Sequence, residues 1–343
     1  MTHYRSWSGR SFAWRIQSPA VDLLSDAFRA IRLVGALYFD VSATAPWIAE
    51  TPAAATLRAR TMREFEHVIS IHIVLAGAAW AQLADQSQPA IGIAAGDTVI
   101  FGHGDAHFMS SEPDARPLSK STPGSPRVDE ALPFALSEAR SGDVRARFVS
   151  AYFGCNARPY NPMLSALPRL LHVRGSSCSN AVTTELISAA LAESRQPRAG
   201  GKTILSRIGE LMFLRAIRQY VESSPGRSTG WLAALRDHNV SAALNAVHVN
   251  PAEPWTLSAL AREAGLSRSM FAKRFRRVTG MSAMQYLGNW RLQLATSMLE
   301  QEGASVTRIA SYVGYESDAA FNRAFKKRLG VPPGTWRRLK LGA

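Results

Sequence analysis

Two stretches near the end of the chain decide its fold: LSALAREAGLSRSMFAKRFRRVTG, residues 257–280, and VTRIASYVGYESDAAFNRAFKKRLG, residues 306–330. The second stretch repeats the first with one extra residue in its turn. Five pairs of residues occupy equivalent places: Ala261 and Ala310, Gly265 and Gly314, Phe271 and Phe321, Phe275 and Phe325, and Gly280 and Gly330. A short helix, a glycine-centred turn and a longer basic helix predict a helix-turn-helix unit. The chain therefore carries two such units in tandem.

The turn residues of both units fit this interpretation. Gly265 and Gly314 stand where a chain that leaves a helix often needs a positive φ. Ser267 and Ser317 follow, and a serine hydroxyl there can accept a hydrogen bond from an otherwise unpaired N–H of the next helix. The longer helix of each unit is therefore expected to begin just after its serine.

Each longer helix is expected to have an inward and an outward side, because successive residues are turned by about 100°. The inward side carries Phe271, Arg274, Phe275 and Val278 in the first unit and Phe321, Ala324 and Phe325 in the second. Basic side chains on the outward side can bind phosphates or guanine edges. The candidate DNA contacts are Ser269, Lys273, Arg276, Ala319, Asn322, Arg323 and Lys326.

Positive charge is concentrated in the same part of the chain. The whole sequence has a formal net charge of +14, and residues 250–343 contain 15 Lys and Arg against 6 Asp and Glu. An ordinary helical bundle with solvated basic side chains is the alternative explanation for one such unit. Two units on a strongly basic segment indicate binding to double-stranded DNA.

These residues resemble the AraC/XylS family of bacterial transcription regulators over about 231–339. The most specific element is GYESDAAFNRAFKKRLGVPPGTWRR, residues 314–338, which is similar to the family's C-terminal signature. The resemblance implies two recognition helices in successive major grooves, joined by a long central helix. Residues 281–300 suit that connector. Its expected apolar stripe consists of Met284, Leu287, Leu294, Met298 and Leu299.

The first part of the chain, from about residue 21 to 155, contains short stretches rich in β-branched and aromatic residues with glycine turns between them. This pattern predicts an antiparallel β-barrel or jelly roll. GDTVIFGHGDAH, residues 96–107, resembles the second motif of the cupin family, with Gly102 where a proline is usual. The resemblance implies a cupin-type sensor domain that receives a signal.

Four histidines of this first part are candidate effector-binding residues: His67, His72, His103 and His107. A cupin metal site needs about four N or O ligands that converge in the barrel. Only His107 fits its motif position, and the first cupin motif is not recognisable. We therefore expect no metal, no cofactor and no catalytic residue. The alternative to effector binding is that these histidines are turn and barrel-mouth residues bonded to their neighbours.

Beyond Asn161 the pattern becomes helical, with apolar residues at i, i+3 and i+4 in residues 161–173, 183–195 and 203–223. The last of these has a stripe that looks too long for the barrel alone to cover. In similar regulators this region dimerises, so we expect a homodimer, with packing onto the barrel as the alternative. The stripe consists of Leu205, Ile208, Leu211, Met212, Arg215 and Tyr220.

The predicted fold is α+β with two domains. SSPGRSTG has the composition of a flexible linker between them. The expected boundaries are 1–222 for a cupin-like sensing and dimerisation domain (barrel about 21–155, helices about 161–222), 223–230 for the linker, and 231–343 for an all-α DNA-binding domain.

The sequence has no recognisable signal peptide, because Arg5, Arg10 and Arg15 interrupt its first residues. Its least polar run, residues 68–84, is short for a membrane span. Cys155 and Cys178 are too few for a disulfide framework, which fits the cytoplasm. Two buried structural cysteines are expected, with a redox-sensing pair as the alternative.

Together these features predict a sequence-specific transcription regulator that controls a nearby operon in response to a small molecule or stress signal. The expected partners are promoter DNA, a second copy of the chain, a small-molecule effector, and RNA polymerase if the protein is an activator; no membrane is expected. One alternative is a cupin-type metal-dependent enzyme fused to a DNA-binding domain. Another is an architectural nucleoid protein, in which basic residues would be spread more evenly.

Overall fold

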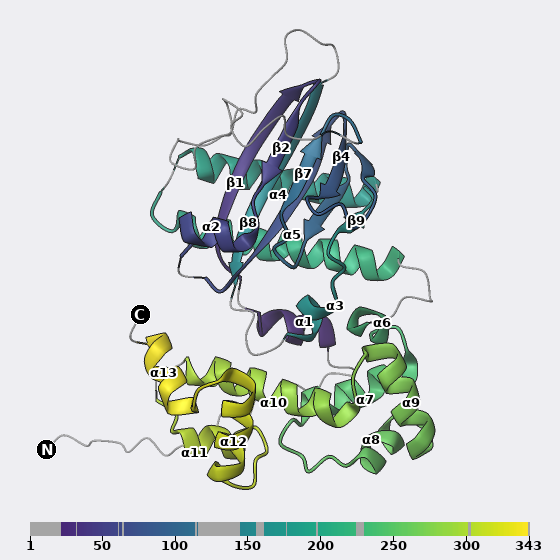
Figure 1. The fold of residues 1–343 in the computed structure, drawn as a ribbon, viewed down its shortest axis with the longest axis vertical. Coiled ribbons are helices and arrows are strands. Elements are labelled where there is room, and N and C mark those ends of the chain that lie inside the picture. Colours follow the sequence, from purple (N-terminus) through teal and green to yellow (C-terminus); the bar gives the residue numbers. More distant parts are fainter. Residues whose placement is uncertain are drawn as a thin grey trace, which may run out of the picture.

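The structure is a computed structural model that describes residues 22–31, 33–60, 62–63, 65–113, 115, 145–155, 161–175, 177–196, 198–223, 230–300 and 303–341. Most of the predicted linker lies outside these ranges. Figure 1 shows a sheet-rich first domain above an all-helical second domain. This confirms the two-domain α+β layout. Within the described ranges, no helix is both long enough and apolar enough to cross a membrane.

The first domain contains two antiparallel sheets. One has the order β1-β8-β3-β6-β9 and the other the order β2-β7-β4-β5. The strands are β1 Leu33–Thr44, β2 Ile48–Thr51, β3 His67–Ala76, β4 Ala78–Leu83, β5 Ile91–Ala94, β6 Thr98–Phe101, β7 His107–Ser110, β8 Arg145–Cys155 and β9 Leu171–Val173.

Of the predicted barrel or jelly roll, a closed barrel is wrong, because no described strand pairs across the two sheets. Large side chains from both sheets fill the space between them, among them Trp47 and Phe148, whose rings stack with centroids 5.4 Å apart. The two sheets are therefore held together by side-chain packing rather than by a continuous ladder of hydrogen bonds.

Two long helices, α4 Ser177–Arg195 and α5 Gly201–Ser223, cover the five-stranded sheet, which confirms the helices predicted at 183–195 and 203–223. Phe213 and Ile217 of α5 are fully buried. The hydroxyl of Tyr38 on β1 donates to the carbonyl of Leu205 at 2.9 Å. Most of the apolar stripe of α5 therefore packs within its own domain, although Leu211 remains 45% exposed.

Two short helices were not predicted: α1 Leu23–Arg29 and α2 Ala54–Arg60. The Asp22 side chain begins α1 by accepting from the backbone N–H of Ser25 at 3.2 Å. The helix expected over 161–173 forms only in part. It ends with α3 Pro162–Ala166, and Leu171–Val173 instead forms strand β9, which pairs with β6.

The second domain consists of eight helices within the described residues: α6 Trp231–Ala234, α7 His238–Val249, α8 Leu257–Glu263, α9 Arg268–Thr279, α10 Ala283–Leu299, α11 Val306–Tyr312, α12 Asp318–Leu329 and α13 Pro333–Leu341. The two repeated units are α8–α9 and α11–α12, as predicted, and α10 is the connector. Leu287 and Leu299 of its apolar stripe are buried, whereas Met284 is exposed.

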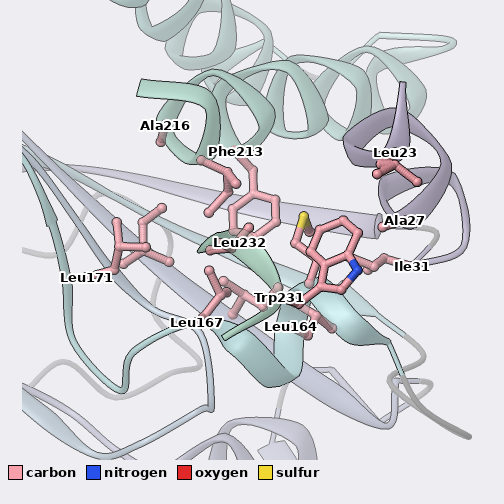
Figure 2. Close-up of a cluster of buried hydrophobic side chains, with 14 of the residues drawn as sticks. Leu23, Ala27, Ile31, Leu164, Leu167, Leu171, Phe213, Ala216, Trp231 and Leu232 are labelled. Carbon is pink, nitrogen blue, oxygen red and sulfur yellow. The ribbon is translucent and has the colours of Figure 1, made fainter. Parts of the chain in front are cut away.

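The two domains pack against each other along an interdomain seam, formed by α1 and α3 of the first domain and α6 and α7 of the second. Figure 2 shows the apolar centre of this seam, where Trp231 and Leu232 of α6 lie among residues of α1, α3 and α5. The seam thus buries side chains from both domains in one continuous cluster.

Polar contacts extend the interdomain seam to the rest of the second domain. His248 Nδ1 on α7 lies 3.5 Å from a carboxylate oxygen of Asp26, and the Gln293 amide on α10 donates to the carbonyl of Ala30 at 2.8 Å. Lys340 on α13 forms an ion pair with Glu66. The first domain therefore contacts α7, α10 and α13.

Candidate nucleic-acid interface

The turns of both units have the geometry that their sequences predict. Gly265 and Gly314 have φ values of +64° and +86°. Ser267 begins α9 by accepting from the N–H of Met270 at 3.4 Å, and Ser317 begins α12 by accepting from the N–H of Ala320 at 3.2 Å. The two longer helices are therefore started in the same way.

The inward sides of α9 and α12 are also equivalent. Phe271 and Phe275 are buried with ring centroids 5.5 Å apart, and Phe321 and Phe325 repeat this spacing at 5.5 Å. Each pair meets edge to face, at 62° and 61°. Because both helices are anchored through the same two positions, their opposite sides point away from the protein core.

Arg274 lies on the inward side, as expected, and has a specific partner there. Its Nε lies 2.9 Å from one carboxylate oxygen of Asp237 and 3.1 Å from the other. The Asp237 side chain also begins α7 by accepting from the N–H of Val240. These hydrogen bonds hold the pKa of Asp237 below its usual value although burial opposes the shift. Arg274 therefore anchors α9 of the first unit to α7.

The outward sides carry the candidate DNA contacts. Ser269, Lys273, Arg276, Ala319, Arg323 and Lys326 are exposed. Asn322 differs, because it is half-buried and its amide nitrogen donates to the carbonyl of Asp318 at 2.8 Å. What remains available on Asn322 is its side-chain oxygen, which can only accept hydrogen bonds.

Sequence reasoning did not select three further exposed residues near these sides: Met270, Arg277 and Lys327. Met270 is 61% exposed in the first turn of α9. The run of basic residues at 326–328 could have indicated that Lys327 is exposed, because the whole run lies in the last turn of α12. Met270 gave no such signal, because an apolar residue at this spacing usually packs inward.

The four histidines of the first domain do not meet at one point. His72 Nε2 lies 2.7 Å from His107 Nε2. His67 and His103 instead each bond through Nε2 to a backbone carbonyl at 2.7 Å. Among the residues that the structure describes, no group of three or more His, Cys, Asp and Glu side chains could hold a metal ion.

The contacting pair has a defined hydrogen-bond direction. His107 Nδ1 faces the carbonyl of Asp105 at 2.8 Å, and a carbonyl only accepts, so Nδ1 carries the hydrogen. His107 Nε2 therefore accepts from His72 Nε2, and His72 Nδ1 accepts from the hydroxyl of Ser150 at 2.8 Å. Both rings are buried, and this burial lowers the pKa of both, that of His107 to about 4.

Cys155 is buried at the end of β8, and burial raises the pKa of its thiol to about 12. A thiol with this pKa stays protonated near neutral pH, which makes it a poor nucleophile. The side chain of Cys178 lies outside the described residues, so the predicted alternative of a cysteine pair remains untested.

Comparisons with known proteins agree with this architecture. Residues 22–222 match the cupin family, and residues 260–339 match the family of helix-turn-helix domains. A Streptomyces lividans protein named as an AraC-like transcription regulator is 30% identical, over 79% of this chain and 87% of its own. The transcriptional regulator AlkR of Acinetobacter baylyi is 28% identical over 92% of this chain and 99% of its own.

Among solved structures, the DNA-binding domain of AdpA in complex with target DNA is similar. It is 30% identical with a TM-score of 0.29, and the match covers 30% of this chain and 92% of that one. Taken with the cupin match over residues 22–222 and the Streptomyces relative, the tandem helix-turn-helix units identify the chain as a member of the AraC-like transcription regulators with an N-terminal cupin domain.

Proposed function

We propose that the protein regulates transcription by placing α9 and α12 in successive major grooves of promoter DNA. The observation that carries this proposal is the matched construction of the two helices, which have equivalent buried phenylalanines and exposed cationic sides. Lys273, Arg276, Arg323 and Lys326 are the proposed donors to phosphates or guanine edges. The remaining proposed contacts are Ser269, Ala319 and Asn322.

Single substitutions on the outward sides test this proposal. Arg323→Ala is expected to cost about 1–3 kcal/mol of binding free energy and to relax selectivity at one base position if Arg323 reads a base. If Lys273 contacts a phosphate, Lys273→Ala will weaken all DNA sequences alike and lower the salt slope by about one. Equilibrium titrations against duplexes at several salt concentrations measure both quantities.

Two variants serve as controls for this experiment. Arg63→Ala removes an exposed arginine from the first domain and is expected to leave DNA affinity unchanged. Phe325→Ala truncates a buried ring and is expected to lower stability by about 3–5 kcal/mol. Unchanged binding by both Arg323→Ala and Lys273→Ala contradicts the proposed interface. Loss of binding by Phe325→Ala with a normal melting temperature contradicts the inward assignment.

We also propose that the protein acts as a homodimer through the outer face of α4 and α5. Ile204 and Leu211 are seven residues apart on the same side of α5, and each is 45% exposed. Val182 on α4 is 40% exposed. Most of the stripe predicted for dimerisation is covered within the domain, so these three residues carry the proposal.

A charge placed on this face tests the dimer. Leu211→Glu is expected to convert a dimer to a monomer, because the carboxylate would have to be buried in the interface. Mass measurement by light scattering during size exclusion detects the change. Ala95→Glu adds the same charge in the exposed turn before β6 and is expected to leave the mass unchanged. A wild-type protein that is monomeric at micromolar concentration contradicts the dimer.

The first domain is proposed to sense a small molecule or stress signal, with His67, His72, His103 and His107 as candidate contacts. Support comes from the buried pair of His72 and His107, which places polar ring atoms between the two sheets, next to the buried hydroxyl of Ser150. The relatives named as transcription regulators support a role without catalysis. The proposed location is the cytoplasm, with RNA polymerase as a further partner if the protein activates transcription.

A further inference from the structure

One side chain of the connector α10 bonds to the turn of the second helix-turn-helix unit and to the loop that leads into the first. Arg291 donates from Nε to the carbonyl of Pro251 at 2.7 Å and from Nη2 to the carbonyl of Glu253 at 2.8 Å. Its Nη1 donates to the carbonyl of Gly314 at 2.9 Å. Pro251 and Glu253 lie in the loop that leads into α8, and Gly314 forms the turn between α11 and α12. Two of these carbonyls therefore lie just before the first unit, and the third belongs to the second unit.

The backbones of the two units also touch at this point. A Cβ atom on Gly314 would lie 2.6 Å from the Cα of Ala252 and 2.8 Å from Arg291 Nη2. Only a residue without a side chain allows this approach, and the φ of +86° favours glycine there as well. Gly314 thus closes the turn of the second unit and also lets that turn rest on the loop before the first.

The apolar cores of the two units are otherwise separate. Phe271 and Phe275 belong to the cluster that continues into the interdomain seam. Phe321 and Phe325 belong to a different cluster, with the C-terminal half of α10 and Trp336 of α13. Arg291 lies between Trp290 of the first cluster and Leu292 of the second. Leu294 of α10 is partly buried and packs against both clusters, and the hydrogen bonds of Arg291 join the two units beside it.

We propose that Arg291 is a positioning residue that fixes the distance and rotation between α9 and α12, and that it thereby makes the protein select DNA by the spacing of two half-sites. This rests on the proposal that both helices bind DNA. One inserted base pair moves a half-site by about 3.4 Å and rotates it by about 35°. A fixed pair of helices cannot follow both changes, whereas a pair without the hydrogen bonds of Arg291 has more freedom to twist about α10.

The chemistry of arginine suits this role. Its planar guanidinium presents donors in a rigid fork, so three carbonyls in fixed directions can be bonded at once. A lysine ammonium keeps the positive charge but has no such fork. Arg291→Lys therefore separates loss of geometry from loss of charge, which matters because any loss of positive charge weakens DNA binding.

The test uses full-length protein and DNA that wild-type protein selects from a randomised 40-base-pair library. The selected duplex is then remade with one base pair inserted or deleted between the half-sites bound by one protomer. Wild type is expected to lose about tenfold in affinity for the altered spacings, the size of a typical base-pair penalty. Arg291→Lys is expected to lose about threefold or less, because the freed units can adjust.

Ser282→Ala is the matched control on the same helix. Ser282 begins α10 by accepting from the N–H of Gln285, so its loss weakens the connector without touching either unit's contact with Arg291. This variant is expected to keep the wild-type spacing penalty. A wild-type penalty in Arg291→Lys overturns the proposal. Where Arg291→Lys is unfolded at the assay temperature, Arg291→Gln takes its place with the same criterion.

A measurement without DNA separates this proposal from that of the DNA interface. Spin labels on the exposed positions Glu263 and Ser311, in a background without Cys155 and Cys178, report the distance between the units by pulsed electron resonance. The distance distribution is expected to broaden in Arg291→Lys and not in Ser282→Ala. If the width of the distance distribution is unchanged in Arg291→Lys, Arg291 does not fix the relative position of the two units. A different result is a selected DNA with a single half-site, together with a distance distribution that broadens in Arg291→Lys. That result overturns the proposal that both helices bind DNA, and the proposed selection of half-site spacing fails with it.

Discussion

At the scale of single residues, the pair of His72 and His107 has no place for an additional proton. Both nitrogens of each ring already have partners at 2.7–2.8 Å. A proton on His107 Nε2 would face the hydrogen that His72 Nε2 donates. Burial and this geometry act in the same direction, so the folded protein holds both rings neutral.

This predicts a loss of stability in mild acid. In the unfolded chain these histidines bind protons below a pKa of about 6.5. In the folded chain burial lowers the pKa of His107 to about 4, so between these values the unfolded state binds more protons and stability falls as the pH falls. Each such histidine is expected to cost about 1.4 kcal/mol between pH 7.5 and 5.5.

Urea unfolding at the two pH values measures this cost. His107→Gln is expected to show a smaller pH dependence than wild type. Burial also lowers the pKa of His67 and His248, so part of the dependence will remain in His107→Gln. Equal pH dependence in wild type and His107→Gln would show that this pair is not neutral in the folded state.

At the scale of elements, helix α5 approaches the sheet through Gly209. A Cβ atom there would lie 2.1 Å from a ring carbon of Phe153 on β8. Alanine normally stabilises the interior of a helix relative to glycine. At Gly209 the clash with a buried ring outweighs this gain, because β8 is an inner strand of the five-stranded sheet and cannot move away.

Gly209→Ala is therefore expected to destabilise the protein by about 1–3 kcal/mol, the usual cost of overpacking. The matched control is Gly288→Ala in the middle of α10, where a Cβ atom would meet nothing within 4 Å. That variant is expected to stabilise by about 0.5–1 kcal/mol. Thermal melting of both variants gives the two signs. If both changes stabilise, α5 is not docked at Gly209.

The elements that the sequence predicted well are those with a repeated or long pattern. Phe275 and Phe325 fixed the inward sides of α9 and α12 because the same spacing occurs twice. Helix α1 was missed because its two buried residues, Leu23 and Ala27, make too short a pattern, and they are covered by parts of the chain distant in sequence. Strand β9 was missed because its pairing with β6 overrides the local helical pattern.

The residues of the candidate interface also divide into those that the sequence could predict and those that it could not. Outward residues such as Lys273 and Arg323 could be predicted from helical geometry, since a helix with one buried side exposes the other. The role of Arg291 could not, because its partners are backbone carbonyls 23 to 40 residues away in the chain. In sequence it is one more basic residue on a basic segment.

At the scale of the whole molecule, the interdomain seam determines what the second domain can do alone. A fragment of residues 230–343 retains both units, but it exposes Trp231 and Leu232, which the seam buries. We expect it to fold and to bind DNA, with a lower melting temperature than the same domain has in the full chain. Its affinity should be lower too, because the proposed dimer raises the effective concentration of a second pair of units.

Three measurements compare the fragment with the full chain and check this prediction: DNA affinity at equal salt concentration, melting temperature, and mass in solution. Leu232→Ser is the internal control, since it should lower the melting temperature of the full chain more than that of the fragment, where this side chain is already exposed. If the fragment melts at the same temperature as the full chain and binds DNA with equal affinity, the seam does not contribute to stability and dimerisation does not contribute to affinity.

The seam lies on the side of α10 away from α11 and α12, so the first domain leaves these helices uncovered (Figure 1). A signal molecule that alters the seam can then change DNA affinity without competing for the DNA-binding surface. Such coupling is reciprocal: whatever factor the ligand applies to DNA affinity, DNA applies to ligand affinity. Under the proposed sensing role, each promoter would also be an effector of the first domain, and promoters that deform the seam differently would respond at different concentrations of one signal.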